Sequence, residues 1–96
     1  MPDHTPNVSF LENVQSTLED RKNQYGTAEE LFTHIAKRWS LTLSQAITPA
    51  QVAICMMDLK MARLAHDPKH HDSLMDIVGY ANCLADLKAS GKAFTP

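Results

Sequence analysis

The chain has few of the residues that mark several common protein classes. Its 96 residues include 2 cysteines and 3 glycines, and its formal net charge is −2. Cys55 and Cys83 lie within apolar segments without a second ligand at zinc spacing, so we expect buried, reduced thiols. Three glycines are too few for a glycine-rich phosphate loop. A slightly acidic chain has no general attraction to nucleic acid, so any phosphate site must be a local basic cluster.

Long hydrophobic runs are also absent. No apolar run approaches the roughly 18 residues that a membrane span needs. The first residues, MPDHTPNV, lack the apolar core of a signal peptide. We therefore expect a soluble, cytoplasmic protein. The length suits one domain, and a hydrophobic fraction of 44% supplies a core.

Helical periodicity is the dominant pattern that is present, and no segment has the alternation of a strand. The apolar spacing predicts helices over about 9–22, 27–39, 48–65 and 72–90, with residues 40–47 as a linker. The fold class is therefore all-α, a four-helix bundle. We expect residues 9–91 to form a single domain, with residues 1–8 as a flexible N-terminal arm and residues 92–96 as a flexible tail.

Capping residues set the expected helix ends. Ser9 with Glu12, Thr27 with Glu30, and Thr48 with Gln51 each have capping-box spacing, and Pro49 follows Thr48 at the favoured first position. Asp72 or His71 is the expected cap of the last helix. Gly26 and Gly91 are expected as left-handed stops.

The third predicted helix is apolar on nearly every side between Val52 and Leu64. Such a helix is buried on most sides, either at the centre of the molecule or in a subunit interface. We therefore predict a homo-oligomer, a dimer or a tetramer.

Two groups of charged residues are candidates for a site. Asp72 and Asp76 are one helical turn apart and could share a divalent cation, or they could be a cap and an ion-pair partner. Asp58, Lys60 and Arg63 interrupt the apolar third helix. Lys60 and Arg63 could hold a phosphate, or Arg63 could pair with Asp76. The loop histidines His66, His70 and His71 fit no zinc pattern and are expected to be solvated.

The order of motifs resembles a known group. Arg21-x-x-x-Tyr25-Gly26 comes first, then ITPAQVAICMMDLKMARL, and then DSLMDIVGYA from Asp72 to Ala81. This order resembles a small family of phage and prophage proteins, over about residues 10–88. That family in turn looks like a distant relative of the all-α NTP pyrophosphatases (the MazG-like group) and of the nucleotide-modification-associated domains.

The resemblance implies a helical bundle in which Mg²⁺ holds a nucleoside triphosphate for cleavage between its α and β phosphates, in the bacterial host cell. It implies Asp72 and Asp76 as catalytic, metal-binding residues. Asp58 and Glu30, or its neighbour Glu29, are the candidates for further metal ligands. The implied phosphate- or nucleotide-binding residues are Lys60, Arg63, Arg21, Tyr25 and Tyr80.

Three functions remain open from the sequence. One is a Mg²⁺-dependent (d)NTP pyrophosphohydrolase, for which the mixture of cations with the carboxylates is unfavourable. Another is a non-catalytic nucleotide binder, or a sponge acting on a host signalling nucleotide. The third is a structural or regulatory helical oligomer. In the first two the partner is a phosphorylated small molecule, and no contact with a membrane or with nucleic acid is expected.

Overall fold

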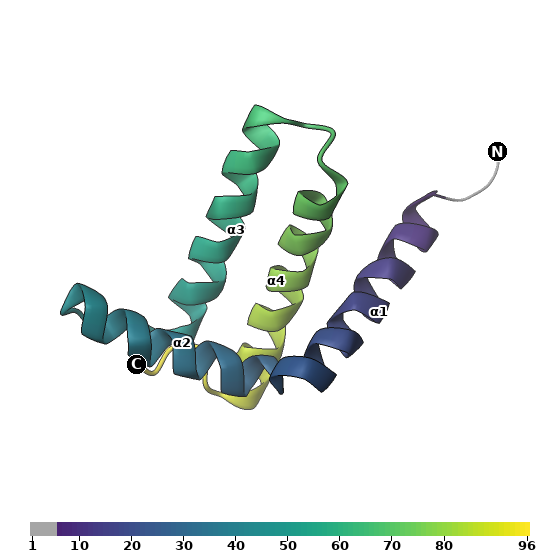
Figure 1. The fold of residues 1–96 in the computed structure, drawn as a ribbon. Helices are drawn as coiled ribbons and strands as arrows, with labels where there is room; N and C mark the ends of the chain where they lie inside the picture. Colours follow the sequence, from purple (N-terminus) through teal and green to yellow (C-terminus); the bar gives the residue numbers. More distant parts are fainter. Residues whose placement is uncertain (1–5) are drawn as a thin grey trace.

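Four helices build the protein in a computed structural model that describes residues 6–96, apart from the side chains of residues 6–8 and Tyr25. They are α1 (Pro6–Tyr25), α2 (Ala28–Leu43), α3 (Pro49–His66) and α4 (His71–Ser90). α3 and α4 form an antiparallel hairpin, α2 crosses its base, and α1 lies beside α4 (Figure 1). Residues 6–96 contain no strand, and this confirms the predicted all-α class with four helices. None of these helices is both long and apolar enough to cross a membrane.

The first helix begins earlier than predicted. It starts at Pro6, so Ser9 lies inside the helix, and the predicted cap at Ser9 is wrong. Proline suits a first helical turn because its φ is already helical and its missing N–H would have no partner there. Residues 6–8 of the expected flexible arm are therefore helical, and residues 1–5 lie outside the described residues. Gly26 follows the helix with φ of 84°, as expected of a left-handed stop.

Both predicted capping boxes that follow are confirmed. Thr27 Oγ1 accepts the Glu30 N–H at 3.1 Å, and Glu30 Oε1 accepts the Thr27 N–H at 3.1 Å. At the start of α3, Thr48 Oγ1 accepts the Gln51 N–H at 3.2 Å, and Gln51 Oε1 accepts the Thr48 N–H at 2.8 Å. These short-range bonds satisfy N–H groups that a helix start leaves without partners, so local sequence alone is sufficient to specify them.

The second helix extends into the predicted linker. It ends at Leu43, and Ser44 then adopts a left-handed conformation with φ of 52°. Ser40 lies within the helix, where its hydroxyl donates to the Ala36 carbonyl at 2.7 Å and accepts the Ile47 N–H at 2.9 Å. One serine side chain thus holds the turn that brings the chain into α3.

The Thr27–Glu30 box should make a pH-dependent contribution to stability. Hydrogen bonds from the Thr27 N–H and hydroxyl lower the pKa of Glu30 from its ordinary value of 4.5. A carboxylate with a lowered folded-state pKa stabilises the fold above its unfolded pKa, and this contribution is lost as pH falls through the folded-state pKa. We expect Glu30→Gln to be less stable than the parent at neutral pH, and the difference to shrink as the medium is acidified below 4.5. Urea unfolding of both proteins between neutral pH and a pH below 4.5 measures this difference in stability. A difference that does not change with pH would contradict the prediction.

The core lies where α2 crosses the hairpin. Val52, Ala53 and Leu87 are fully buried, and Phe32 and Ala36 of α2 cover them. The segment after α4 closes this end. Contrary to the expected flexible tail, Ala93 is buried and its carbonyl accepts the Ala50 N–H at 2.8 Å. Lys92 in the same segment pairs with Glu29 of α2 at 2.8 Å.

Helix α1 makes its main contacts with α4. Its Thr17 hydroxyl donates to Met75 Sδ at 3.5 Å, and a Cβ atom at Gly79 would lie 3.5 Å from Leu18 Cδ2. The molecule is elongated, because α1 and α2 extend to either side of the α3–α4 hairpin (Figure 1), and its radius of gyration is 14.7 Å. A compact chain of this length has a radius of gyration of about 12.5 Å. A groove opens along one side of the molecule, beside the contact between α1 and α4.

Candidate functional site

Asp76 takes part in the two most buried ion pairs of the described residues. Its Oδ1 lies 3.0 Å from Arg21 Nη2, and its Oδ2 lies 3.1 Å from Lys60 Nζ. The exposed fraction of the side chain is 12% for Asp76, 15% for Lys60 and 42% for Arg21. We call these three residues the Asp76 cluster. It ties α1, α3 and α4 together, and it places two cations on one carboxylate.

Helix geometry accounts for the position of Lys60. Ala53, Met56, Lys60 and Leu64 recur at spacings of three and four, so they share the face of α3 that packs on α4. The aliphatic part of Lys60 can lie along this apolar face, but its ammonium group needs a partner there. Asp76 supplies that partner. The alternative of an ion pair between Arg63 and Asp76 is wrong in detail, because Lys60 and Arg21 occupy the two carboxylate oxygens.

Arg63 points to a different neighbour, His70. Its Nη2 lies 3.4 Å from His70 Nε2. His70 is the N-cap of α4, and its Nδ1 accepts the Ser73 N–H at 3.2 Å. Ser73 is fully buried, with its hydroxyl 2.7 Å from the same nitrogen. The predicted caps, Asp72 and His71, are therefore wrong, because α4 begins at His71 and the residue before it, His70, is the cap.

The predicted metal ligands do not form one set in the described part of the chain. Asp58 and Asp72 are exposed, and Glu30 is engaged in the capping box at the start of α2. Within residues 6–96, no group of three or more His, Cys, Asp or Glu side chains is placed to hold a metal ion. Both oxygens of Asp76 also face cations. Mg²⁺ at these residues stays a prediction, and the donor set of the described residues does not fit it.

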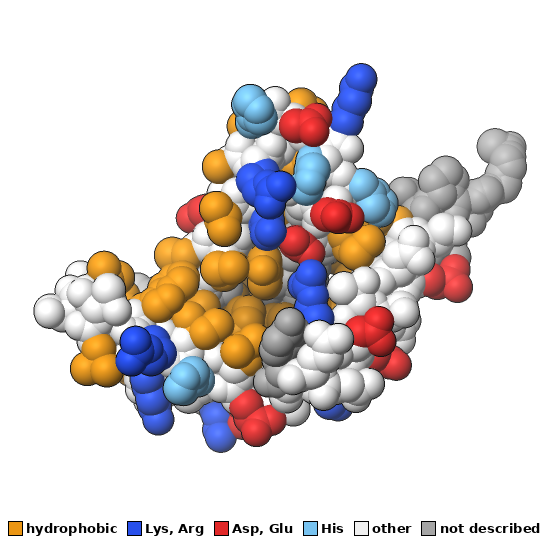
Figure 2. All heavy atoms as spheres, in the orientation of Figure 1, with side chains coloured by type: hydrophobic (Ala, Val, Ile, Leu, Met, Phe, Trp, Pro, Cys, Tyr) orange, Lys and Arg blue, Asp and Glu red, His pale blue; other side chains and the backbone are white. Residues whose placement is uncertain are grey.

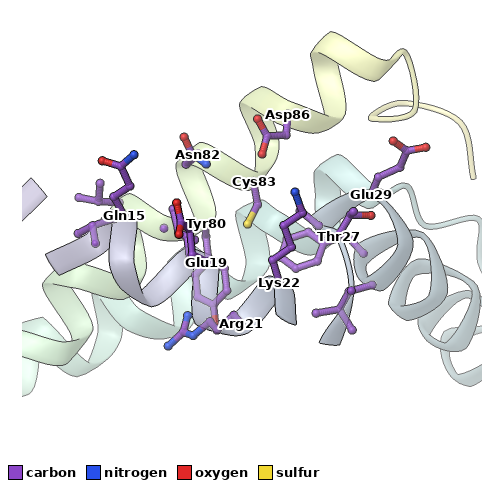
Figure 3. Close-up of a pocket in the computed structure, with 18 of the residues that line it drawn as sticks. Gln15, Glu19, Arg21, Lys22, Thr27, Glu29, Tyr80, Asn82, Cys83 and Asp86 are labelled. Atoms are coloured by element: carbon purple, nitrogen blue, oxygen red, sulfur yellow. The ribbon is translucent and has the colours of Figure 1, made fainter. Parts of the chain in front are cut away.

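A groove of about 840 Å³ opens between α1, the start of α2 and α4 (Figure 3). Arg21 belongs both to this groove and to the Asp76 cluster. Tyr80, one turn after Asp76, also lines the groove, and its ring lies 6.2 Å from that of Phe32. The side chain of Tyr25, another predicted nucleotide contact, lies outside the described residues. The remaining polar lining is Gln15, Glu19, Lys22, Thr27, Glu29, Asn82 and Asp86.

Sequence reasoning missed most of these lining residues. Gln15, Glu19 and Lys22 are polar positions on an amphipathic helix, and such positions usually face water. The signal that could have found them is the narrow apolar stripe of α1. A helix with a narrow apolar stripe buries only that stripe against its neighbour. The polar residues on either side of the stripe can then line a groove between the two helices.

The two cysteines differ in their surroundings. Cys83 lines the groove, where burial raises the pKa of its thiol and the charge of Asp86 raises it further, while Arg21 opposes them. A thiol held protonated is a poor nucleophile, so thiol chemistry is not favoured in this groove. Cys55 is exposed on α3, which corrects the expectation that both thiols are buried.

Comparison with known proteins gives the family of the chain. The gene 55 protein of Mycobacterium phage D29 is 36% identical over 77 residues, which cover 79% of this chain and 51% of that protein. The gene 55 protein of Mycobacterium phage L5 is 32% identical over 83 residues, which cover 84% of this chain and 53% of that protein. The chain thus spans about half the length of these relatives. No solved structure matches it.

The model of one family, described as a domain of unknown function, DUF6378, matches residues 9–88. This match and the two phage relatives confirm the predicted phage protein family. They do not bear on the wider resemblance to the NTP pyrophosphatases, which stays a prediction. With most of its length matched, the chain belongs to the DUF6378 family.

Proposed function

We propose that the protein binds a phosphorylated small molecule of the nucleotide class, with its phosphates at Arg21 and Lys60 and its remaining part in the groove. One observation carries this proposal: cations from two different helices converge on Asp76 at the edge of a groove of about 840 Å³. Small-molecule sites are typically clefts of about 300–1,000 Å³ with mainly apolar walls and a few convergent polar groups.

The Asp76 cluster suits a phosphate because its cations are already held close together. Arg21 is partly exposed and has five N–H donors in all, so it can contact a phosphate while it still touches Asp76. Lys60 is a point charge with three donors. In this arrangement Asp76 is a positioning residue that keeps the two cations at the site. Tyr80 and Phe32 offer an apolar wall to a base, and Gln15 and Asn82 offer amide groups.

Binding is better supported than metal-dependent cleavage. Mg²⁺ is held by carboxylate oxygens together with substrate phosphates, and it needs those oxygens free of other cations. Arg21 and Lys60 occupy both oxygens of Asp76. Asp58 and Asp72 are exposed, and among the described residues they do not combine with Asp76 into a group of three that could hold a metal ion. Hydrolysis by a site centred on Asp72 and Asp76 is therefore the alternative, and the test below would detect it as release of pyrophosphate.

The test is calorimetric titration of the chain with inorganic pyrophosphate and with each NTP and dNTP, once in EDTA and once with Mg²⁺. We expect at least one nucleotide to bind in EDTA. Lys60→Met and Arg21→Met should each raise its Kd about tenfold or more, because each removes a charged hydrogen-bond donor. Lys69→Met changes an exposed lysine in the loop between α3 and α4, and should leave the Kd unchanged.

Other outcomes of this experiment distinguish binding from hydrolysis and from a purely structural role. Ligand recovered intact from the denatured complex supports binding without turnover, whereas pyrophosphate release with Mg²⁺ would favour the hydrolase. If no nucleotide binds, the Asp76 cluster is structural and the proposal is wrong. Equal Kd values for Lys60→Met, Lys69→Met and the parent would also contradict it.

A further inference from the structure

The outer face of α3 carries a second stripe, of three apolar residues and one histidine. The inner stripe, which packs on α4, contains Ala53, Met56, Lys60 and Leu64. On another side of the helix, Cys55, Leu59, Ala62 and His66 recur at spacings of four, three and four. All four are exposed, and Leu59 is 52% exposed. We call these four residues the α3 seam.

Two larger apolar side chains of α3 are exposed farther around the helix. Ile54 and Met61, which lie beyond Asp58 as seen from the seam, are 47% and 55% exposed. Figure 2 shows hydrophobic side chains exposed along α3, with few charges among them. A surface helix normally turns polar residues to water, and contiguous exposed apolar surface marks an interaction site. Alternating spacings of three and four are the pattern of a helix that packs on another helix.

Two opposite charges flank the seam. Asp58 precedes Leu59 on one flank, and Arg63 follows Ala62 on the other. Both are exposed, and neither forms an ion pair with another described residue, although Arg63 contacts His70. A partner helix that covers the seam would need a cation opposite Asp58 and an anion opposite Arg63. The flanks of the same α3 in a second copy supply both.

We propose that two copies of the chain pair through the α3 seam, with their α3 helices side by side and parallel. A two-fold axis along the helices brings the Asp58 flank of one copy against the Arg63 flank of the other. The two residues differ by five positions, about 7.5 Å along the axis, which the long arginine side chain can span. An antiparallel pair would instead bring each flank against itself, and like charges would face each other.

This inference is independent of the nucleotide proposal. The seam lies on α3, whereas the groove is formed by α1, α2 and α4. A protein can therefore pair without binding a ligand, or bind a ligand as a monomer. A two-fold pair through α3 leaves the groove of each copy open.

The first test measures the mass in solution by light scattering at micromolar concentration. We expect a dimer, and we expect Leu59→Asp to raise the dimer Kd at least tenfold. The matched control is Leu41→Asp, because Leu41 is 74% exposed at the end of α2, away from the seam. Circular dichroism checks that both variants keep their helices. A monomeric parent, or equal effects of the two variants, would overturn the proposal.

Charge reversal tests the partner contact itself. Asp58→Arg and Arg63→Asp should each weaken self-association about tenfold or more, since each places like charges together across the pair. An equimolar mixture of the two variants should regain the parental affinity, because each chain then meets its opposite. A mixture as weak as the separate variants would contradict the Asp58–Arg63 contact.

Cys55 reports the direction of the helices. In a parallel pair each seam position faces its own copy, at the Cα separation of about 4.4–6.8 Å that a disulfide requires. Mild oxidation with diamide should therefore link two chains in the parent and in Cys83→Ser, but not in Cys55→Ser. A dimer that gives no link through Cys55 would rule out the parallel arrangement.

Discussion

Replacing Asp76 by asparagine should lower the free energy of unfolding by about 2–3 kcal/mol. Asparagine keeps the shape of the side chain but removes its charge, so Lys60 and Arg21 lose their counter-ion. Lys60 is the costly partner, because its side chain is only 15% exposed on the apolar face between α3 and α4. Removing one member of a buried pair costs about 3–5 kcal/mol. We expect a smaller loss of about 2–3 kcal/mol here, because Arg21 is 42% exposed and can turn to water.

Urea unfolding of Asp76→Asn and Asp72→Asn gives a matched comparison. Asp72 lies on the same helix but is exposed, so its replacement should cost no more than about 0.5–1 kcal/mol, the usual value of an acidic residue in a first turn. The double variant Lys60→Met/Asp76→Leu should recover much of the loss, because a buried pair can often be exchanged for apolar residues at little cost. Equal losses of stability for Asp72→Asn and Asp76→Asn would mean that the Asp76 cluster is solvated and that its ion pairs do not stabilise the fold.

The helices themselves were predictable because their signals are local. Thr27 and Thr48 each cap a helix with a partner three residues away, and both boxes form. Pro49 and Gly91 act through their own backbone preferences, at the start of α3 and the end of α4. Where two local signals competed, the proline signal prevailed over the serine cap. Ser9 had the spacing of a cap, yet the helix continues through it to Pro6.

The pairing within the site was only half predictable. Three charges in an apolar helix indicated that some of them need partners, and this holds for Lys60. Which cation meets Asp76 depends on how α3 and α4 are rotated against each other. Lys60 and Arg63 lie about 60° apart around the helix. A small rotation therefore decides between them, and periodicity does not define it.

Arg21 was harder still to place. It is 55 residues from Asp76 in the chain, and it reaches the carboxylate because α1 packs alongside α4. The groove lies beside the same contact between α1 and α4. A pattern of residues along one helix cannot show an opening between two neighbouring helices. This explains why the sequence suggested a site around Asp72 and Asp76 and not the groove beside Arg21.

Phe32→Ala should have the largest effect on the fold, a loss of about 3–5 kcal/mol in the free energy of unfolding. Phe32 is 4% exposed, and it joins α2 to the core that contains Val52 and Leu87. Truncation removes the contact between its ring and that of Tyr80, and it leaves a cavity beneath the groove. A domain of this size has a total stability of only about 5–10 kcal/mol, so the variant should unfold at a much lower urea concentration.

Phe94→Ala is the matched control, because Phe94 is 68% exposed and the same atoms are removed. Its effect should stay within about 0.5 kcal/mol. Phe32→Leu keeps most of the buried volume and should lie between the two. Phe32 also lines the groove, so Phe32→Leu tests whether its ring contacts a ligand as well as the core. If the folded variant binds a nucleotide more weakly than the parent, the aromatic ring contributes to both. Equal stability losses for Phe32→Ala and Phe94→Ala would show that α2 does not pack on the hairpin of α3 and α4 in solution.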